Sequence, residues 1–305
     1  MKISTPDLVT NSYFPALAAE ELGLYREEGL DAHVELLPSL GAVEALRDGA
    51  VDFVAGNSHS NLLAFPDFKG AKVLVTLSQG TPWLLVMRTD LAVRRGDVGL
   101  VKGRRIAAAP GPDRVFLGIL AAAGIDPARD GVTIGPMKGA LDPGASFGVM
   151  AADALESGAV DGFWANALGS ETAVRRGVGK IVVDVRRGDG PAGAGNYTFA
   201  ALSTSDAVIA RDPDRVAAAV RAIVKAQRVL KKDPGRATEV GRRRFPAAAA
   251  ELIAAVVERD LPFYDPAVSE ASVAAMSRFA QTVGLLKAPV AYDDVVPAHV
   301  RSHWS

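Results

Sequence analysis

The sequence predicts an α/β protein with two similar lobes and a helical C-terminal region. A helix-like run, a glycine and the tripeptide Ala-Val-Asp occur together around Gly49 and again around Gly158. Strand-like and helix-like segments alternate as far as residue 203, and from Pro213 on the pattern is helical almost to the end. Alternating strands and helices imply mostly parallel sheets, and a repeated unit implies two of them.

The repeated glycine explains where each helix stops. Glycine tolerates a left-handed backbone just past a helix end. The residues that follow, 53–55 and 163–165, are short apolar runs that suit buried strands. We therefore expect one helix-to-strand unit in each lobe, and a cleft between two lobes is where small molecules usually bind.

The first lobe is expected to open with a strand followed by a helix. Pro15 suits the start of that helix and Gly23 its end. Alternating or continuous apolar runs predict the strands that come later. The expected strands are residues 2–5, 31–37, 52–55, 73–77 and 83–88, and the expected helices are 15–22, 43–48 and 61–65.

The second lobe repeats this alternation. Gly124 ends one of its helices, and Ser146 is placed to cap another. We assign residues 1–86 and 196–305 to the first lobe, including the C-terminal helices, and residues 87–195, with a glycine-rich linker, to the second. The further strands are expected at 104–109, 132–135, 161–164, 181–185 and 197–203, and the helices at 115–123, 147–155 and 171–175.

The composition excludes several classes of protein. The 305 residues give room for about two domains, and 49% hydrophobic residues supply a sizeable core. The net charge is −1 and no basic stripe carries interleaved aromatic residues, so we expect no nucleic acid partner. The absence of cysteine excludes disulfides, thiolate catalysis and cysteine metal sites. No apolar run approaches the roughly 18 residues of a membrane helix.

The start of the chain leaves its location open. Met1 leads directly into a strand-like segment, and no secretory leader is visible. We expect a periplasmic protein if a leader was removed and Met1 replaces it, and a cytoplasmic one if Met1 is the native start.

Residues 15–31, PALAAEELGLYREEGLD, carry the most specific pattern. They resemble the opening of type II solute-binding proteins, and more narrowly of the nitrate/sulfonate/taurine group that includes the SsuA/THI5-like, or NMT1, domain. Both helix–Gly–x–Val–Asp units and residues 102–106, KGRRI, match the same pattern. The resemblance covers residues 1–235 well and the helical tail loosely. It implies the type II periplasmic-binding-protein fold, in which two α/β lobes close on a ligand by hinge closure.

The candidate ligand-binding residues follow from a general property of such sheets. A ligand lies beyond the carboxyl ends of the strands. The loops at those ends are rich in small hydrogen-bonding residues and aromatic residues, and several precede helix N-termini, which favour anions. The candidates are Asn11, Ser12, Tyr13, Phe14, Ser39, Asn57, Ser58, His59, Gln79, Trp83, Arg114, Trp164 and Asn166.

Each candidate also has a purely structural explanation. The four aromatic residues would fit a core near the strand ends equally well. Ser58 could cap the helix that follows it. Arg114 could form its planar pair with a ligand carboxylate or sulfonate, or could be a solvated arginine at a helix start.

Three patterns that suggest catalysis or cofactor binding fail in their context. Residues 144–148, GASFG, fit a hydrolase nucleophile motif, but no strand precedes them, and Ser146 is better explained as a helix cap. Residues 188–193, GDGPAG, fit a dinucleotide pattern, but no helix follows. His299 and His303 are spaced for a shared metal without a third ligand. We therefore expect no catalytic residue, no cofactor and no metal.

Two kinds of enzyme on this fold offer an alternative. Sulfinate desulfinases resemble the chain at residues 10–12 and 285–290, but their nucleophile is a cysteine where Ser12 stands here. Thiamin-pyrimidine synthases use a lysine and a histidine in the loop after the Asp-Phe strand. Gly56 and Ser60 occupy those places here, and His59 is one position off.

The resemblance therefore implies a solute-binding protein for an ABC-type importer. It would clamp a small anionic or aromatic ligand between its lobes, without catalysis. Its expected partners are this small-molecule ligand and an ABC permease, and we expect a monomer. The alternative is a cytoplasmic enzyme or sensor on the same fold, related to the desulfinases or the thiamin-pyrimidine synthases.

Overall fold

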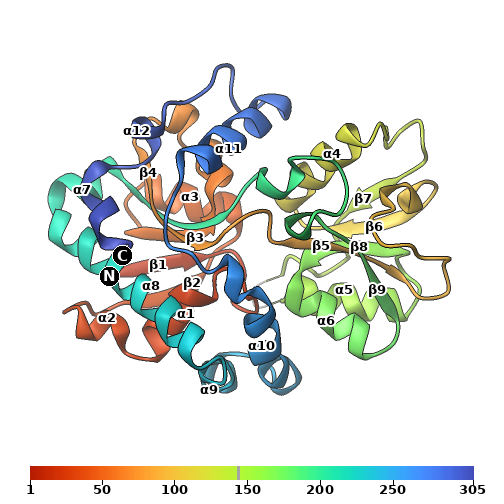
Figure 1. The fold of residues 1–305 in the computed structure, drawn as a ribbon, viewed down its shortest axis with the longest axis horizontal. Coiled ribbons are helices and arrows are strands. Elements are labelled where there is room, and N and C mark those ends of the chain that lie inside the picture. Colours follow the sequence, from red (N-terminus) through yellow and green to blue (C-terminus); the bar gives the residue numbers. More distant parts are fainter. Residues whose placement is uncertain (143–144) are drawn as a thin grey trace. The chain divides into compact units, whose positions relative to one another are not determined.

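Two α/β units make up the protein in a computed structural model that describes residues 1–142 and 145–305. Unit 1 comprises Met1–Gly80 and Thr198–Ser305, and unit 2 comprises Thr81–Tyr197. Each unit holds one five-stranded sheet (Figure 1). The predicted fold class is confirmed. Gly144, the first residue of the G-x-S-x-G pattern, lies outside the described residues.

The sheet of unit 1 is mostly parallel. Its strand order is β2-β1-β3-β10-β4. The strands β2 and β3 run parallel to β1, while β10 runs antiparallel to both of its neighbours. The strands are β1 (Lys2–Thr5), β2 (His33–Leu36), β3 (Phe53–Asn57), β4 (Ala71–Ser78) and β10 (Ala200–Ser205).

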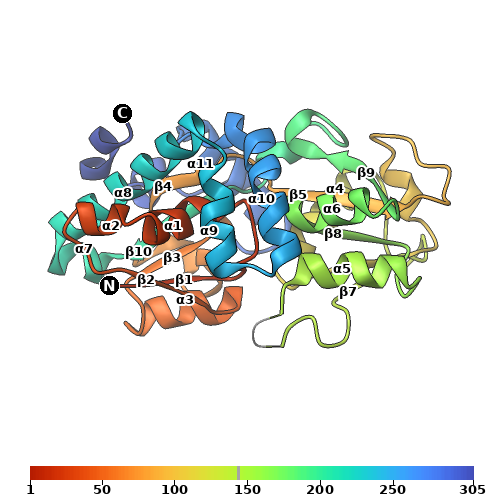
Figure 2. The ribbon, with the colours of Figure 1, turned by 90° about the horizontal axis from the view of Figure 1, so that it is seen from below.

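Helices cover both faces of this sheet. Figure 2 shows α3 on one face and α1, α2 and α8 (Pro213–Lys232) on the other. Val43 and Leu46 of α3 pack in one buried cluster with Val54 of β3. The elements before β10 are α1 (Phe14–Glu21), α2 (Leu24–Glu27), α3 (Ser39–Arg47), η1 (Ser58–Leu63) and η2 (Pro66–Phe68).

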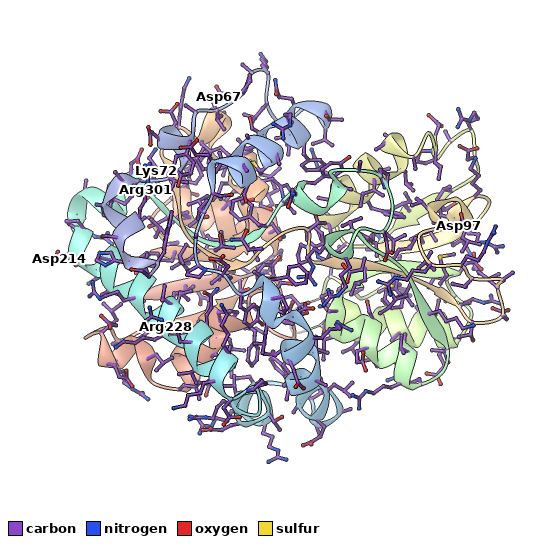
Figure 3. The ribbon with its side chains drawn as sticks, viewed as in Figure 1. Asp67, Lys72, Asp97, Asp214, Arg228 and Arg301 are labelled. Carbon is purple, nitrogen blue, oxygen red and sulfur yellow. The ribbon has the colours of Figure 1, made fainter. Side chains whose placement is uncertain are left out.

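The C-terminal region is helical and belongs to unit 1. Lys72 of β4, labelled in Figure 3, donates a 2.7 Å hydrogen bond to the Asp294 carbonyl. The indole N–H of Trp304 donates to the Leu74 carbonyl at 2.9 Å. These bonds tie the end of the chain to the edge strand β4. The helices are α7 (Asp206–Arg211), α8 (Pro213–Lys232), α9 (Arg236–Arg244), α10 (Ala247–Asp260), η6 (Leu261–Phe263), α11 (Glu270–Thr282), α12 (Tyr292–Val295) and η7 (Ala298–His303).

The sheet of unit 2 repeats the topology of unit 1. Its order is β7-β6-β8-β5-β9, with β7 and β8 parallel to β6 and with β5 antiparallel to β8 and β9. In both sheets the antiparallel strand is the one that the chain enters on arriving from the other unit. The strands are β5 (Trp83–Arg88), β6 (Arg105–Ala108), β7 (Thr133–Gly135), β8 (Gly162–Asn166) and β9 (Gly179–Asp184).

Successive residues of β8 face opposite layers of helices, as the two-residue period of a strand requires. Phe163 packs in the cluster formed by α5 and α6. Trp164 stacks on Phe116 of α4. Figure 1 shows α4 on one face of the sheet and α5 and α6 on the other. The helices of unit 2 are η3 (Val98–Val101), α4 (Pro112–Ala122), α5 (Phe147–Glu156), α6 (Ala167–Arg175), η4 (Val185–Arg187) and η5 (Ala194–Asn196).

The unit boundaries differ slightly from the sequence assignment at 86/87 and 195/196. They fall at 80/81 and 197/198. Residues 81–86 belong to unit 2 because β5 pairs with β8 and β9. The glycine-rich stretch also belongs to unit 2, where the Asp189 carboxylate accepts from the Asp184 amide at 2.8 Å and pairs with Arg95 at 3.0 Å. Hydrogen bonds therefore hold this segment as a turn.

The aspartate of the repeated Ala-Val-Asp accepts a hydrogen bond from a neighbouring strand in both units. Asp52 accepts a 3.0 Å hydrogen bond from the Lys2 amide and pairs with Arg211 at 2.6 Å. Asp161 accepts a 2.9 Å bond from the Arg105 amide. In each unit the carboxylate thus binds the amide of the first residue of the neighbouring parallel strand. The glycine before it has a positive φ, 75° at Gly49 and 73° at Gly158.

These contacts lower the pKa of both carboxyl groups. Burial raises the pKa of Asp52, but the Lys2 amide and the Arg211 guanidinium outweigh it. Burial likewise raises the pKa of Asp161, and the Arg105 amide and guanidinium together with Arg88 outweigh it. Both carboxyl groups are therefore more acidic than an ordinary aspartate.

Asp52→Asn should destabilise the protein by about 1–3 kcal/mol, because a charge-assisted hydrogen bond and an ion pair are lost. The urea unfolding midpoint at pH 7, followed by circular dichroism, measures this. Asp48→Asn is the matched control, since Asp48 is exposed and pairs with its neighbour Arg47. An equal loss in both variants would contradict the structural role of Asp52.

The stabilisation by Asp52 should depend on pH in one direction. A carboxyl group whose pKa is lower in the folded state stabilises fully above its unfolded value of about 3.9 and loses that contribution as the pH falls through the folded value. The difference in urea midpoint between the wild type and Asp52→Asn should therefore shrink from about pH 4 downwards. If the difference in urea midpoint stayed constant down to about pH 2.5, which is roughly one to two pH units below the unfolded value, the lowered pKa of Asp52 in the folded state would be contradicted.

Candidate functional site

The carboxyl ends of β1 and β3 lie at the same edge of the first sheet because the two strands are parallel. The loop after β1 carries Asn11, Ser12 and Tyr13, and β3 ends at Asn57. All four side chains are buried. The structure therefore brings together, at one edge of unit 1, polar residues that lie 44 or more positions apart in the sequence.

Tyr13 and Asn57 form a direct pair. The Asn57 Nδ2 donates to the Tyr13 hydroxyl at 2.6 Å. Burial raises the pKa of Tyr13 and the nearby Asp7 raises it further, while the Asn57 hydrogen bond acts against both. The phenol therefore stays protonated near neutral pH, and its O–H can donate to a bound group.

The loop after β1 is held by residues from the far C-terminal region. The Asn11 Nδ2 donates to the Asp260 Oδ2 at 2.5 Å, and the Tyr264 hydroxyl donates to the Asn11 carbonyl at 2.6 Å. Nothing in the sequence pointed to Asp260 or Tyr264 as partners of this loop. No local signal could have found them, because each lies about 250 positions from its partner and meets it only through the packing of unit 1.

Ser58 and His59 meet at Thr198, just before β10. The Thr198 hydroxyl lies 3.2 Å from the Ser58 Oγ and 2.8 Å from the His59 Nδ1. The His59 ring also packs edge-on against Phe279. Ser58 does not cap the following helix with its side chain, because Asn57 is the N-cap of η1 and no side chain caps it. These hydrogen bonds join η1 to the entry of β10.

Two further candidates make structural contacts within unit 1. Gln79 donates through Nε2 to the carbonyls of Asp265 at 3.2 Å and Ala267 at 2.6 Å, so its amide tethers the C-terminal region to β4. Phe14 is fully buried and packs edge-on against Phe245, with the ring centres 6.0 Å apart. Phe14 therefore packs in the core of unit 1, and its role in a ligand wall stays a prediction.

Ser39 stands in the first turn of α3, at the same edge of the sheet. No side chain caps this helix. Ser39 lines a narrow recess together with Asn57 and Ser60, between α3 and β3. Ser60, which the sequence analysis did not select as a ligand-binding residue, is thus placed beside two residues that it did select.

In unit 2 the carboxyl end of β8 gathers three of the predicted residues. Trp83 pairs with Asn166 in the antiparallel ladder, because β5 begins where β8 ends. Trp164 lies between two rings, stacked on Phe116 at 5.3 Å and tilted against Trp83 at 6.3 Å. Phe116 was missed, although its place two residues after Arg114 in the same helix start could have indicated it.

Asn166 and Arg114 occupy helix starts at this edge. The Asn166 Oδ1 accepts from the Gly169 amide at 2.9 Å and so caps α6. Arg114 is exposed and forms no ion pair with any residue in the described ranges 1–142 and 145–305. The Asp113 carboxylate accepts from the Gly111 and Arg114 amides, which leaves the N-terminus of α4 less available to an anion than the sequence suggested.

The remaining sequence patterns do not form a catalytic or metal site among the described residues. Ser146 is the N-cap residue of α5 by position, but its side chain makes no capping bond. Among the described residues, no three His, Asp or Glu side chains gather closely enough to hold a metal ion. Within the same residues, no helix is both long and apolar enough to cross a membrane.

The family model NMT1/THI5 like matches residues 10–237. The chain belongs to the NMT1/THI5-like family. The match includes the Asn11 loop, both Ala-Val-Asp units and the strand-end residues of both sheets, and it ends before Asp260 and Tyr264. No curated protein sequence matches this NMT1/THI5-like chain.

Solved structures share the fold at low sequence identity. The alkanesulfonate-binding protein SsuA from Xanthomonas axonopodis, bound to MOPS, is 18% identical with a TM-score of 0.69, and the match covers 97% of each chain. The nitrate-binding protein NrtA from Synechocystis is 15% identical with a TM-score of 0.70, over 99% of this chain and 87% of its own. The desulfurization enzyme DszB is 17% identical with a TM-score of 0.67, over 99% and 98%.

Tyr264→Phe should loosen the Asn11 loop. The lost hydrogen bond to the Asn11 carbonyl predicts faster amide hydrogen exchange over residues 7–13 and a destabilisation of about 0.5–1.5 kcal/mol. Tyr292→Phe is the control, since it removes a similar bond, 2.7 Å to the Val268 carbonyl, elsewhere in the C-terminal region. If both variants change exchange over residues 7–13 alike, Tyr264 does not specifically hold this loop.

Proposed function

We propose that this chain is the solute-binding component of an ABC-type importer. Its ligand is a small anionic or aromatic solute, bound at the strand-end loops. The observation that carries the proposal is the gathering of buried polar and aromatic side chains at the carboxyl end of each sheet, in a chain of the NMT1/THI5-like family. Ligands of such sheets lie beyond those strand ends.

The two units would make different contributions. Unit 1 offers the protonated Tyr13 hydroxyl and the amides of Asn11 and Asn57. Unit 2 offers the exposed Arg114, which suits an acidic group. Trp164 is buried between Phe116 and Trp83, and its indole Nε1 has no hydrogen-bond partner among the described residues, so it can donate to an acceptor of the solute. An acid fits these features best.

Structural relatives support this class of protein. SsuA and NrtA are described as binding proteins for alkanesulfonates and for nitrate. An ABC permease as partner, a periplasmic location and a monomeric state follow for this chain if it shares their role. The solute itself is left to experiment, because folds host many ligands and the site decides among them.

DszB gives a specific reason to consider the alternative, an enzyme of the desulfinase kind on the same fold. The geometry of unit 1 argues against it. The Ser12 hydroxyl has no hydrogen-bond partner among the described residues, and the His59 Nδ1 is bonded to Thr198. A serine nucleophile needs a base within hydrogen-bond reach, and this pair does not supply one.

A thermal-shift screen tests the proposed function directly. The compounds would be sulfonates, sulfinates, aromatic carboxylates, pyrimidines and amino-acid derivatives. A ligand that binds only the folded state at 100 times its Kd stabilises by about 2.7 kcal/mol, enough to raise the melting temperature clearly. Mass spectrometry of each stabilising compound after incubation separates binding from turnover. A screen without any stabilising compound, or a product formed by the wild type and not by Ser12→Ala, contradicts the proposal.

Arg114→Ala should weaken an anionic hit by about 1.5–3 kcal/mol, the usual contribution of a hydrogen bond to a charged group. Isothermal titration calorimetry measures the change. Arg94→Ala is the control, because Arg94 follows the opposite end of β5 and removes the same charge from unit 2. Unchanged affinity in Arg114→Ala, or an equal loss in both variants, would remove Arg114 from the site.

A further inference from the structure

Several unpaired polar atoms lie at the carboxyl edge of the first sheet. Five side chains at the end of β3 or in the segments after β1 and β3 are at most 4% exposed, and each has one polar atom without a hydrogen-bond partner among the described residues. Buried polar atoms in folded proteins nearly always have partners, so such a group indicates a place completed by something bound. The atoms are the Asn11 Oδ1, Ser12 Oγ, Asn57 Oδ1, Ser60 Oγ and, further along η1 beside Ser203 of β10, the Asn61 Oδ1.

The orientation of Asn11 is fixed by its partner. Its Nδ2 donates to the Asp260 Oδ2. The Arg259 Nε lies 3.5 Å from the other carboxyl oxygen of Asp260. A carboxylate paired with an arginine accepts hydrogen bonds, so the NH₂ end of the amide faces it. The Asn11 Oδ1 must therefore face away from Asp260, as an atom that can only accept a hydrogen bond.

Three of the other atoms, on Asn57, Ser12 and Ser60, do not restrict the ligand in this way. Asn57 is paired with the Tyr13 hydroxyl, which both donates and accepts, so this amide can present either end. The hydroxyls of Ser12 and Ser60 also serve in either role. They can match a donor or an acceptor, whereas Asn11 requires a donor.

We infer that the solute carries a hydrogen-bond donor, an N–H or O–H, that binds the Asn11 Oδ1, and that Asp260 is the positioning residue that makes this atom an acceptor. The inference rests on the proposed function and narrows its ligand class. A solute with acceptors alone, such as nitrate or an unsubstituted alkanesulfonate, leaves the amide oxygen unpaired in a buried site, which is costly. The ligand is thus an anionic or aromatic compound that also bears an ammonium, amide or hydroxyl group.

Matched pairs of compounds test this on the full chain by calorimetry. Ethanesulfonate is compared with 2-aminoethanesulfonate and 2-hydroxyethanesulfonate, and benzoate with its 4-aminomethyl, 4-carbamoyl and 4-hydroxy derivatives. In at least one series the donor-bearing compound should bind about 10-fold or more tightly than its parent, because a site built to hydrogen-bond a group rejects analogues without it. The three substituents distinguish ammonium, amide and hydroxyl donors.

Asp260→Asn separates positioning from a general structural role. An asparagine at 260 both donates and accepts, so Asn11 becomes free to turn its NH₂ towards the ligand. The preference for the donor-bearing compound should fall to about 3-fold or less, while the parent binds as well or better. Asp265→Asn makes the same change five residues away, where Asp265 accepts from the Ala267 amide, and should keep the preference. Asn11→Leu removes the acceptor itself and should also abolish the preference.

The outcomes are distinct. Equal binding of parent and donor-bearing compounds in both series, or a full preference retained in both Asp260→Asn and Asn11→Leu, overturns this inference and leaves the solute-binding proposal standing. If neither these compounds nor any member of the wider screen binds, the proposed function fails, and this inference fails with it.

Discussion

The hydrogen bond from a strand amide to the aspartate of the repeated Ala-Val-Asp is the contact on which each unit depends. In unit 1 it joins Asp52 to the Lys2 amide, and in unit 2 it joins Asp161 to the Arg105 amide. Each aspartate lies one residue before a central parallel strand. The bond therefore sets how far that strand extends along its neighbour, and with it the position of every side chain at the other end.

The far end of each strand carries an asparagine. Asn57 ends β3 and Asn166 ends β8, each five residues after its aspartate. The same register thus places an amide at the carboxyl edge of both sheets. The two amides are used differently, since Asn166 caps α6 while Asn57 binds the Tyr13 hydroxyl. One repeated sequence therefore supplies a structural cap in unit 2 and a candidate binding group in unit 1.

The C-terminal region turns the edge of unit 1 into a specific site. Asp260 and Tyr264 hold Asn11 by its side chain and by its backbone. Gln79, which follows β4, binds the carbonyls of Asp265 and Ala267, directly after Tyr264 in the chain. Because both the side-chain amide and the backbone carbonyl of Asn11 are held, the loop presents its hydrogen-bonding group in one defined orientation. Such preorganisation favours selective binding, because little conformational entropy is lost on association.

The sequence by itself determined the alternation of strands and helices, the two sheets and the family, because these depend on local apolar periodicity, on glycines at helix ends and on contiguous motifs. It also indicated the strand-end loops, since parallel strands must present their carboxyl ends together. It could not predict that Phe14 packs on Phe245 or that the Gln79 amide binds the carbonyls of Asp265 and Ala267. It gave no sign of Asp260. Only the tertiary structure decided these roles, because each depends on a partner about 190–250 positions away whose approach is set by packing and by no local pattern.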